Sequence, residues 1–133
     1  YSSNSNIYLS DNSIEYYYTK DSVDIIRNKN NDYKTNFVFS RDFFIEAQTC
    51  NPYYNKRVCI DVEGNIKNCL KNYMTFGNVK IHNLLEIVTS REFQKLWFIN
   101  SDKIIDVYNH ELRYNMYITN DLEEIGNNFY KII

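Results

Sequence analysis

The fold of this chain is decided by residues 57–70, which read RVCIDVEGNIKNCL. Apolar and polar residues alternate over 57–62, and this period of two is typical of a β-strand. Gly64 follows, and glycine can adopt the positive φ that a tight hairpin turn needs. The chain then returns through residues 66–70, which are again partly apolar. These features predict a β-hairpin with Gly64 in its turn.

The region before this hairpin carries weaker signals. Residues 1–42 are polar and poorly patterned, which predicts an extended, linker-like segment or the end of a larger upstream domain. Aromatic residues at 36–39 and 43–45 predict short extended segments. The run Tyr16, Tyr17, Tyr18 offers large contact areas with polar tips. It is therefore a candidate peptide-binding edge, with ordinary strand packing as the alternative.

Short helices are predicted after the hairpin and a second glycine turn at residues 76–78. Asn83 and Glu86 have the spacing of a capping box, in which two side chains satisfy free amide groups reciprocally. Ser90 can cap a helix over residues 91–98. The apolar stripe of that helix supplies three predicted core residues, which are Phe93, Leu96 and Trp97.

The C-terminus is predicted to be an amphipathic helix. Residues 120–123 repeat the capping pattern. Apolar side chains then recur at a spacing of three to four, at Leu122, Ile125, Phe129 and Ile132. Gly126 is unfavourable there, at about 1 kcal/mol relative to alanine. Extended segments, one hairpin and several short helices together predict an α+β fold, with the domain over residues 43–133.

Composition excludes several classes of function. The 133 residues are 44% hydrophobic, which is enough for a core at this length. The formal net charge of -2 gives no basic footprint for nucleic acid, so no such partner is expected. The apolar runs are too short to span a membrane, and no secretion signal is evident, so we expect a cytoplasmic protein. Three cysteines, an odd number, favour reduced thiols or metal ligands over disulfides.

No catalytic set of side chains is predicted. His110 is followed by Glu111, but neighbours in sequence do not face each other on a helix. Arg113 is predicted to form a structural ion pair with Glu111, Glu92 or Asp102. No serine–histidine–acid set and no phosphate-binding glycine loop is present.

The spacing of Cys50, Gly64 and Cys69 is the pattern most relevant to chemistry. Two thiolates brought together across a glycine hairpin can bind a soft metal or an iron–sulfur cluster. Alternatively, free cysteines pack as small hydrophobic residues inside a hairpin. The spacing alone leaves both interpretations open.

Several short motifs follow one another in a fixed order, namely IDVEGNIKNC at 60–69, FGNVK at 76–80, LLEI at 84–87, EFQKLWFI at 92–99, DKI at 102–104 and ELRY at 111–114. Together they resemble the SPASM domain of radical-SAM peptide maturases of the grasp-with-spasm type. In such systems a radical-SAM protein acts beside an ATP-grasp ligase that modifies a ribosomally made peptide. The resemblance covers roughly residues 43–120 and implies a SPASM-like fold.

The resemblance also implies where cluster ligands would stand. SPASM domains bind auxiliary four-iron, four-sulfur clusters. Cys50 and Cys69 match the first ligand element, and Tyr53 is a competing match for its first ligand. The positions of the second element fall on residues other than cysteine, which are Val107, His110, Met116 and either Thr119 or Asn120.

This departure bears on the cofactor. Iron–sulfur clusters are held mainly by cysteine thiolates, usually four for each cluster. We therefore expect a degenerate domain without a cofactor, in which Cys50 and Cys69 are remnant cluster positions. The alternatives are a four-iron, four-sulfur cluster or a zinc ion. Zinc accepts three cysteines and one histidine, and the candidate ligands are Cys50, Cys59, Cys69 and His110.

The preferred functional hypothesis is an accessory domain in ribosomal peptide maturation. It would position a precursor peptide or a partner enzyme, such as the ATP-grasp ligase, and would carry no catalysis of its own. One alternative is a C-terminal fragment of an active radical-SAM peptide maturase, whose catalytic barrel would lie outside this sequence. Another is a small interaction domain stabilised by zinc.

Overall fold

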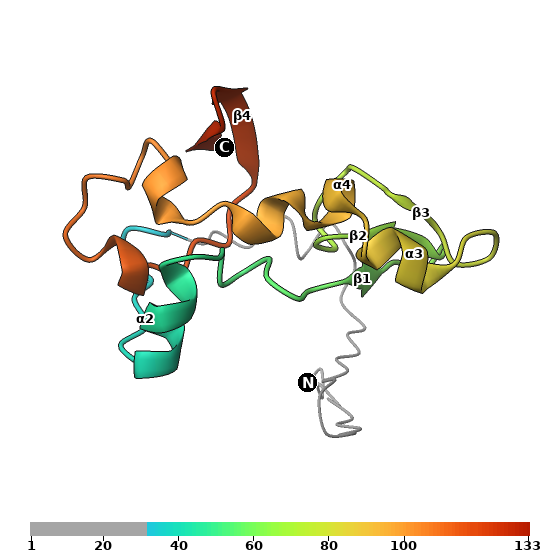
Figure 1. Ribbon diagram of the computed structural model, residues 1–133, viewed down its shortest axis with the longest axis horizontal. Coiled ribbons are helices and arrows are strands. Elements are labelled where there is room, and N and C mark those ends of the chain that lie inside the picture. Colours follow the sequence, from blue (N-terminus) through green and yellow to red (C-terminus); the bar gives the residue numbers. More distant parts are fainter. Residues whose placement is uncertain (1–31) are drawn as a thin grey trace, which may run out of the picture.

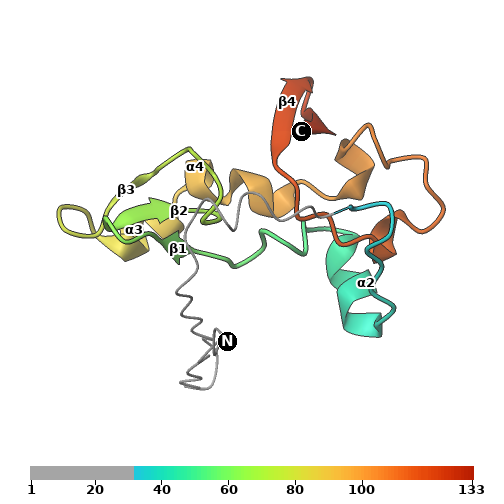
Figure 2. The ribbon, with the colours of Figure 1, turned by 180° about the vertical axis from the view of Figure 1, so that it is seen from behind.

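The computed structural model describes residues 32–133, and this part of the chain is elongated (Figure 1 and Figure 2). Its helices are α2 (Arg41–Ala47), α3 (Leu84–Val88) and α4 (Arg91–Gln94), and its strands are β1 (Cys59–Ile60), β2 (Asn65–Lys67), β3 (Gly77–Asn78), β4 (Leu122–Gly126) and β5 (Phe129–Ile132). Short 3-10 turns lie at Lys95–Phe98, Ser101–Lys103 and Arg113–Asn115. The predicted α+β class is confirmed. No helix among the described residues has the length and apolar character needed to cross a membrane.

The molecule has two ends with different contents. Strands β1 to β3 lie with α3 and α4 at one end, whereas α2 and the β4–β5 hairpin lie at the other (Figure 1). The sheet at the first end has the order β1-β2-β3, and β4 and β5 form a separate two-stranded sheet. The 3-10 turn that follows α4 runs between the two ends (Figure 1).

The predicted hairpin at 57–70 is confirmed. Strand β1 pairs antiparallel with β2, with Cys59 opposite Lys67. Gly64 has a φ of 89° in the turn, a conformation that side-chain-bearing residues rarely adopt. The Asp61 carboxylate accepts hydrogen bonds from the Asn65 backbone N–H at 2.9 Å and from the Asn65 side chain at 3.1 Å. It also forms an ion pair of 3.1 Å with Lys67, and both side chains are 8% exposed.

The prediction of a glycine turn at residues 76–78 is wrong. These residues contribute β3, because the Phe76 N–H donates to the carbonyl of Ile66 at 2.9 Å and the ladder continues beyond it. Gly77 has a φ of 155°, which residues with a side chain rarely adopt, and it also lies close to the end of the Ile87 side chain. A Cβ atom there would lie 2.5 Å from the side chain of Ile87.

The capped helices after the sheet are confirmed. The Asn83 side chain accepts the N–H of Leu85 at 2.9 Å, and the Ser90 hydroxyl accepts the N–H of Phe93 at 3.2 Å. Both bonds satisfy amide groups that a helix leaves free at its start. Beyond Gln94 the predicted helix tightens into a 3-10 turn.

The extended segment predicted at 43–45 is wrong, because these residues lie in α2. The Ser40 hydroxyl accepts the N–H of Phe43 at 3.2 Å and caps that helix, and Asp42 adds a favourable negative charge to its first turn. These local start signals outweigh the preference of aromatic residues for strands. At 36–39 the backbone forms only an isolated antiparallel bridge, between Phe37 and Met116.

The predicted C-terminal helix is also wrong, because these residues form the β4–β5 hairpin. Gly126, Asn127 and Asn128 have φ values of 110°, 52° and 60°. Asparagine tolerates the left-handed region better than most residues, and two successive positive φ values are typical of a two-residue hairpin turn. The turn chemistry therefore outweighs the helical spacing of the apolar residues.

Two hydrophobic clusters form the core. The hairpin cluster contains Tyr54, Ile66, Cys69, Phe93 and Trp97. The C-terminal cluster contains Ile99, Ile104, Val107, Met116, Ile118 and Tyr130. Leu96 and Leu122 pack against both clusters and connect them. Phe93 and Trp97 thus lie in the core as predicted, with 0% and 9% exposure.

Candidate functional site

One cysteine of the predicted pattern, Cys69, contacts the hydroxyl of Tyr53. Cys69 follows β2 and is 4% exposed within the hairpin cluster. Its Sγ atom lies 2.8 Å from the Oη atom of Tyr53, and either atom can donate the hydrogen bond. Tyr53 comes from the turn after α2, so the contact joins that turn to the hairpin.

Two cations and two aromatic rings surround Tyr53. The guanidinium carbon of Arg57 lies 4.2 Å from the centre of the Tyr53 ring, and the Lys71 amine lies 5.5 Å from it. The rings of Tyr54 and Tyr117 meet Tyr53 edge-on, at centroid distances of 4.9 and 5.8 Å. Cation–π and edge-to-face contacts of this kind fix the orientation of a ring. Tyr53 is therefore held in place on several sides.

Burial shifts the pKa values of two side chains in this region, Tyr53 and Cys59. Burial raises the pKa of the Tyr53 hydroxyl well above its usual range, and the neighbouring Cys69 raises it further. Burial also raises the pKa of the Cys59 thiol, with an added contribution from Cys69. Metal ligation by cysteine requires the thiolate. The Cys59 thiol is therefore protonated at neutral pH unless a cation binds it.

The other two cysteines have separate surroundings. Cys50 follows α2, where its N–H donates to the carbonyl of Glu46 at 2.9 Å and its sulfur accepts from the Thr49 hydroxyl at 3.7 Å. Cys59 lies in β1, and its sulfur is 3.9 Å from the carbonyl oxygen of Asn68.

The positions that the resemblance assigns to the second ligand element are largely buried. Val107 and Met116 are 2% and 3% exposed, and both pack in the C-terminal cluster. The carbonyl of Thr119 accepts a short hydrogen bond from the Lys71 amine. The carbonyl of Asn120 accepts the Tyr54 hydroxyl at 3.3 Å. Val107 and Met116 thus serve packing, and the backbone carbonyls of Thr119 and Asn120 accept hydrogen bonds, whereas the buried side-chain oxygens of these two residues have no partner among the described residues.

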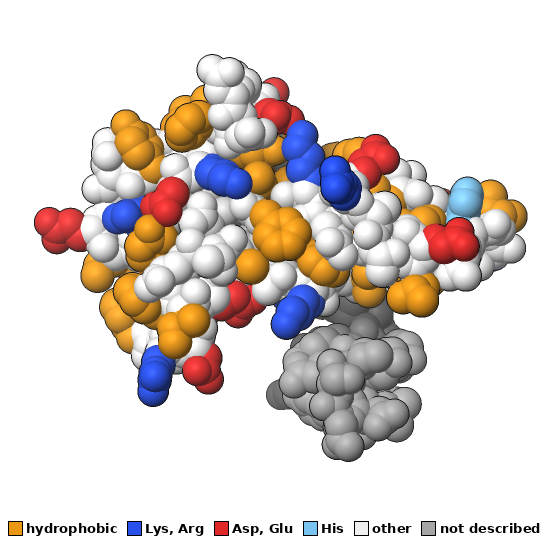
Figure 3. All heavy atoms as spheres, viewed as in Figure 1, with side chains coloured by type: hydrophobic (Ala, Val, Ile, Leu, Met, Phe, Trp, Pro, Cys, Tyr) orange, Lys and Arg blue, Asp and Glu red, His pale blue; other side chains and the backbone are white. Residues whose placement is uncertain are grey.

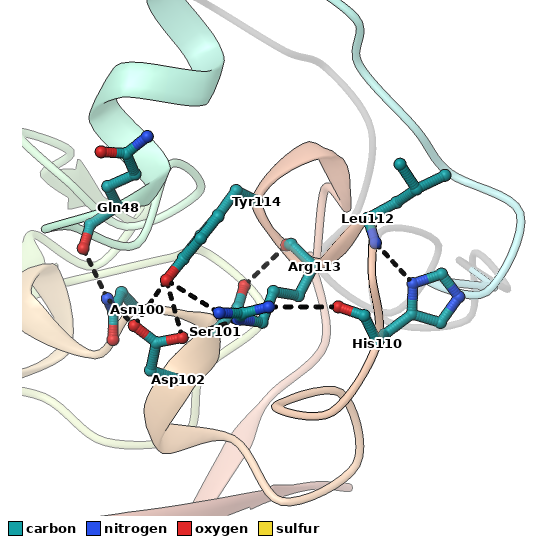
Figure 4. A network of polar contacts seen from close by, with 8 residues as sticks. All are labelled: Gln48, Asn100, Ser101, Asp102, His110, Leu112, Arg113 and Tyr114. Carbon is teal, nitrogen blue, oxygen red and sulfur yellow. Dashed lines mark hydrogen bonds and ion pairs between the residues drawn. The ribbon is translucent and has the colours of Figure 1, made fainter.

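His110 belongs to a polar network on the C-terminal side of the molecule (Figure 4). Its Nδ1 atom accepts the N–H of Leu112 at 3.0 Å. Asp102 accepts hydrogen bonds from the Arg113 guanidinium at 2.7 Å and from the Tyr114 hydroxyl at 2.8 Å. Of the three partners predicted for Arg113, Asp102 is thus the one observed. The network joins Asn100 to the carbonyl of Gln48 at 2.7 Å, so it also anchors the end of α2.

The predicted metal ligands do not converge. Within residues 32–133, no group of three or more histidine, cysteine, aspartate or glutamate side chains is arranged to hold a metal ion. Cys50, Cys59, Cys69 and His110 accordingly form no common site in this structure. The candidate peptide-binding residues Tyr16, Tyr17 and Tyr18 lie outside the described residues.

Sequence reasoning missed the contacts that Tyr53 makes. The family resemblance marked it as a competing match for the first ligand position, and no pattern in the sequence indicated its contact with Cys69. The stacking of Arg57 on its ring depends on a turn whose conformation the sequence did not predict. In that turn Lys56 has a positive φ of 55°.

The outer edge of β1 carries free backbone groups. In an antiparallel ladder, residue pairs alternate between those that exchange hydrogen bonds and those that do not. The Asp61 N–H donates to the carbonyl of Asn65 at 3.1 Å, so Asp61 and Asn65 are a hydrogen-bonded pair. The next pair, Ile60 and Ile66, is therefore one that does not exchange hydrogen bonds. The carbonyl of Ile66 instead accepts from Phe76 in the direction of β3. The N–H and C=O of Ile60 therefore point away from the sheet, where no described residue bonds to them.

Exposed apolar side chains lie in β1 and in the residues that flank this two-residue strand. Val58, Ile60 and Val62 stand at alternate positions and are 39%, 44% and 98% exposed. Figure 3 shows the charged side chains of one face scattered among hydrophobic ones, without a large patch of one sign. Exposed apolar residues on an edge strand are uncommon in monomeric proteins, because such an edge can pair with another chain.

Comparison with known proteins gives one match. The model of the SPASM family, described as an iron–sulfur cluster-binding domain, matches residues 50–119. This range covers slightly more than half of the 133 residues. Searches of curated proteins and of solved structures found no match.

The residues present do not fit an iron–sulfur cluster. A cluster usually needs four cysteine thiolates, and the whole chain has three cysteines. Two of the expected ligand positions, Val107 and Met116, are packed into the hydrophobic core. The sulfur of Cys69 already forms a hydrogen bond with the hydroxyl of Tyr53.

Proposed function

Because the chain belongs to the SPASM family, we propose that it is an accessory domain of ribosomal peptide maturation that positions a precursor peptide or a partner enzyme. Its partners in this proposal are a precursor peptide and an ATP-grasp ligase, and it carries no catalysis of its own. The family match supports the association with radical-SAM proteins. The role in peptide positioning rests on the outer edge of β1.

The single observation that carries the proposal is the open edge of β1. An extended peptide can add a strand to such an edge, gaining affinity from main-chain hydrogen bonds and specificity from alternate side chains. Ile60 offers an outward N–H and C=O, and Val58 and Val62 flank it with exposed apolar surface. An extended segment with apolar residues at alternate positions is the ligand that matches these groups.

The test is a titration of the full chain with fluorescent synthetic peptides. The peptides would cover the leader and core of precursors encoded beside ATP-grasp ligase genes. Binding by strand addition requires the Ile60 N–H, so Ile60→Pro should weaken it by about tenfold or more. Proline is tolerated where the N–H of an edge strand faces solvent, so β1 and β2 should stay paired.

Ile60→Ala is the matched control for this experiment. It shortens the same side chain but keeps the backbone donor, so its affinity should fall less than that of Ile60→Pro. The absence of binding at high micromolar peptide would contradict the proposal. Equal losses in both variants would mean that the side chain, and not the backbone edge, binds the peptide.

A further inference from the structure

Two positions assigned to cluster ligands by the family resemblance touch each other in this chain, and one of them is a tyrosine. Cys50 and Tyr53 compete as the match for the first ligand. Only Tyr53 has its side chain at Cys69, with the Oη and Sγ atoms 2.8 Å apart. The sulfur of Cys50 instead accepts from the adjacent Thr49. In this structure the side chain at Cys69 is therefore that of Tyr53 and not that of Cys50.

Packed side chains enclose the contact between Tyr53 and Cys69. Cys69 is 4% exposed and shares the hairpin cluster with Tyr54, which is 0% exposed. Arg57 covers the ring of Tyr53 at 4.2 Å, and the ring of Tyr117 closes another side. A thiol in such a setting is enclosed by side chains and already has a hydrogen-bond partner.

The second group of ligand positions supplies no compensating ligands. Val107 has no donor atom, and the thioether of Met116 is a weak ligand compared with a thiolate. Both are buried in the C-terminal cluster, apart from the hairpin cluster that holds Cys69. His110 is exposed, and its Nδ1 atom is bonded to Leu112.

We propose that Tyr53 takes the place of the first cluster ligand and that its hydrogen bond to Cys69 holds this half of the SPASM fold without a cluster. The phenol ring fills the space beside Cys69, and its hydroxyl forms a hydrogen bond with the sulfur. A bound cluster would otherwise fill that space and bind that sulfur. The cations over the ring keep the phenol oriented toward the thiol. The domain consequently folds and keeps its β1 edge in the absence of iron.

The first test is anaerobic reconstitution of the full chain with ferrous iron and sulfide. After desalting, iron, acid-labile sulfide and visible absorbance are measured, together with the thermal midpoint before and after a chelator. The expected result is no stoichiometric iron and an unchanged midpoint. Stoichiometric iron that raises the midpoint and is lost in Cys69→Ser would overturn the proposal.

The second test measures how fast Cys69 reacts with a chromogenic disulfide reagent. A Cys50→Ser, Cys59→Ser background leaves Cys69 as the only thiol. Tyr53→Phe removes the hydrogen bond and should speed the reaction about tenfold. Tyr54→Phe is the control, because it deletes the neighbouring hydroxyl but not the bond to Cys69. Equal rates in the two variants would overturn the proposal.

A third comparison does not depend on whether Tyr53→Phe folds. Cys69→Ser keeps a group that can bond to the Tyr53 hydroxyl, whereas Cys69→Ala does not. A buried serine without a partner is normally less favourable than alanine. A higher thermal midpoint for Cys69→Ser than for Cys69→Ala therefore supports the hydrogen bond, and the reverse order contradicts it.

Discussion

The two hydrophobic clusters differ in how they accommodate the positions that a SPASM domain would use for cluster ligands. In the hairpin cluster Cys69 remains, and a tyrosine hydroxyl bonds to it. In the C-terminal cluster Val107 and Met116 occupy such positions, and they pack as ordinary apolar residues. The hairpin cluster thus contains a thiol with a hydrogen-bond partner, whereas the C-terminal cluster contains no thiol that would need one. Two different kinds of contact, a hydrogen bond to a thiol and apolar packing, thus occupy these positions in the two clusters.

The charged groups of the two halves differ as well. Beside the hairpin cluster, the ion pair of Asp61 and Lys67 is almost fully buried, with both side chains 8% exposed. On the C-terminal side, Asp102 and Arg113 pair at the surface, with side-chain exposures of 45% and 29%. Water screens an exposed pair and leaves it weak, while a buried pair is costly to break. Removing the charge of Asp61 should therefore cost more stability than removing the charge of Asp102.

The largest loss is expected for Phe93→Ala in the hairpin cluster. Phe93 is fully buried and packs edge-on against Phe76 and Trp97. Truncation of a buried phenylalanine typically lowers the free energy of unfolding by about 3–5 kcal/mol. Urea unfolding followed by circular dichroism measures it. Phe98→Ala is the matched control, because Phe98 is 52% exposed and its loss should stay within about 0.5 kcal/mol.

Met116→Ala tests whether a position that the family resemblance assigns to a ligand serves packing in this chain. Met116 is 3% exposed in the C-terminal cluster, so its truncation should cost about 2–4 kcal/mol by the same measurement. Met74→Ala is the control of the same residue type, since Met74 is 57% exposed. A loss no larger than that of Met74→Ala would show that the C-terminal cluster does not depend on this side chain.

The hairpin and the caps were predictable because each depends on neighbouring residues. Gly64 with alternating residues specifies β1 and β2, and the side chains of Asn83 and Ser90 bond to amides two or three residues away. The C-terminal hairpin was missed because its apolar residues also fit a helical period. The left-handed conformation of Asn127 and Asn128 decides between the two, and asparagine signals it less strongly than glycine.

The candidate site was less predictable than the fold. The contact of Tyr53 with Cys69 joins residues on different elements, and a sequence pattern gives no distance between them. Spacing can nominate Cys50 and Tyr53 equally, because both lie in the irregular segment after α2. Likewise, the family resemblance assigns Val107 and Met116 to ligand positions without showing that they are buried together.

Asp61→Asn should have an intermediate effect and a distinct dependence on pH. Hydrogen bonds from Asn65 and the charge of Lys67 outweigh desolvation and lower the pKa of Asp61 from 3.8 to about 2. This contribution is present above the unfolded pKa and is lost as the pH falls toward 2, and it amounts to about 2 kcal/mol at neutral pH. Thermal melts between neutral and acidic pH should show the difference between wild type and variant shrinking below about pH 4.

Glu63→Gln is the matched control for the Asp61 prediction. Glu63 lies in the same turn and also contacts the Asn65 side chain, at 3.3 Å, but it is exposed. Its variant should leave both the stability and the pH profile close to those of the wild type. A similar profile for the two variants would mean that the buried pair with Lys67 does not distinguish the hairpin half.

The smallest effect is expected for Asp102→Asn in the exposed network. The Arg113 guanidinium and the Tyr114 hydroxyl lower the pKa of Asp102, but solvent reaches the carboxylate. Because water already screens this pair, which is far more exposed than the pair of Asp61 and Lys67, the variant should lose less than Asp61→Asn. Because salt screens exposed charges, the difference from the wild type in thermal midpoint should shrink at high salt. A salt-independent loss as large as that of Asp61→Asn would remove the contrast between the two halves.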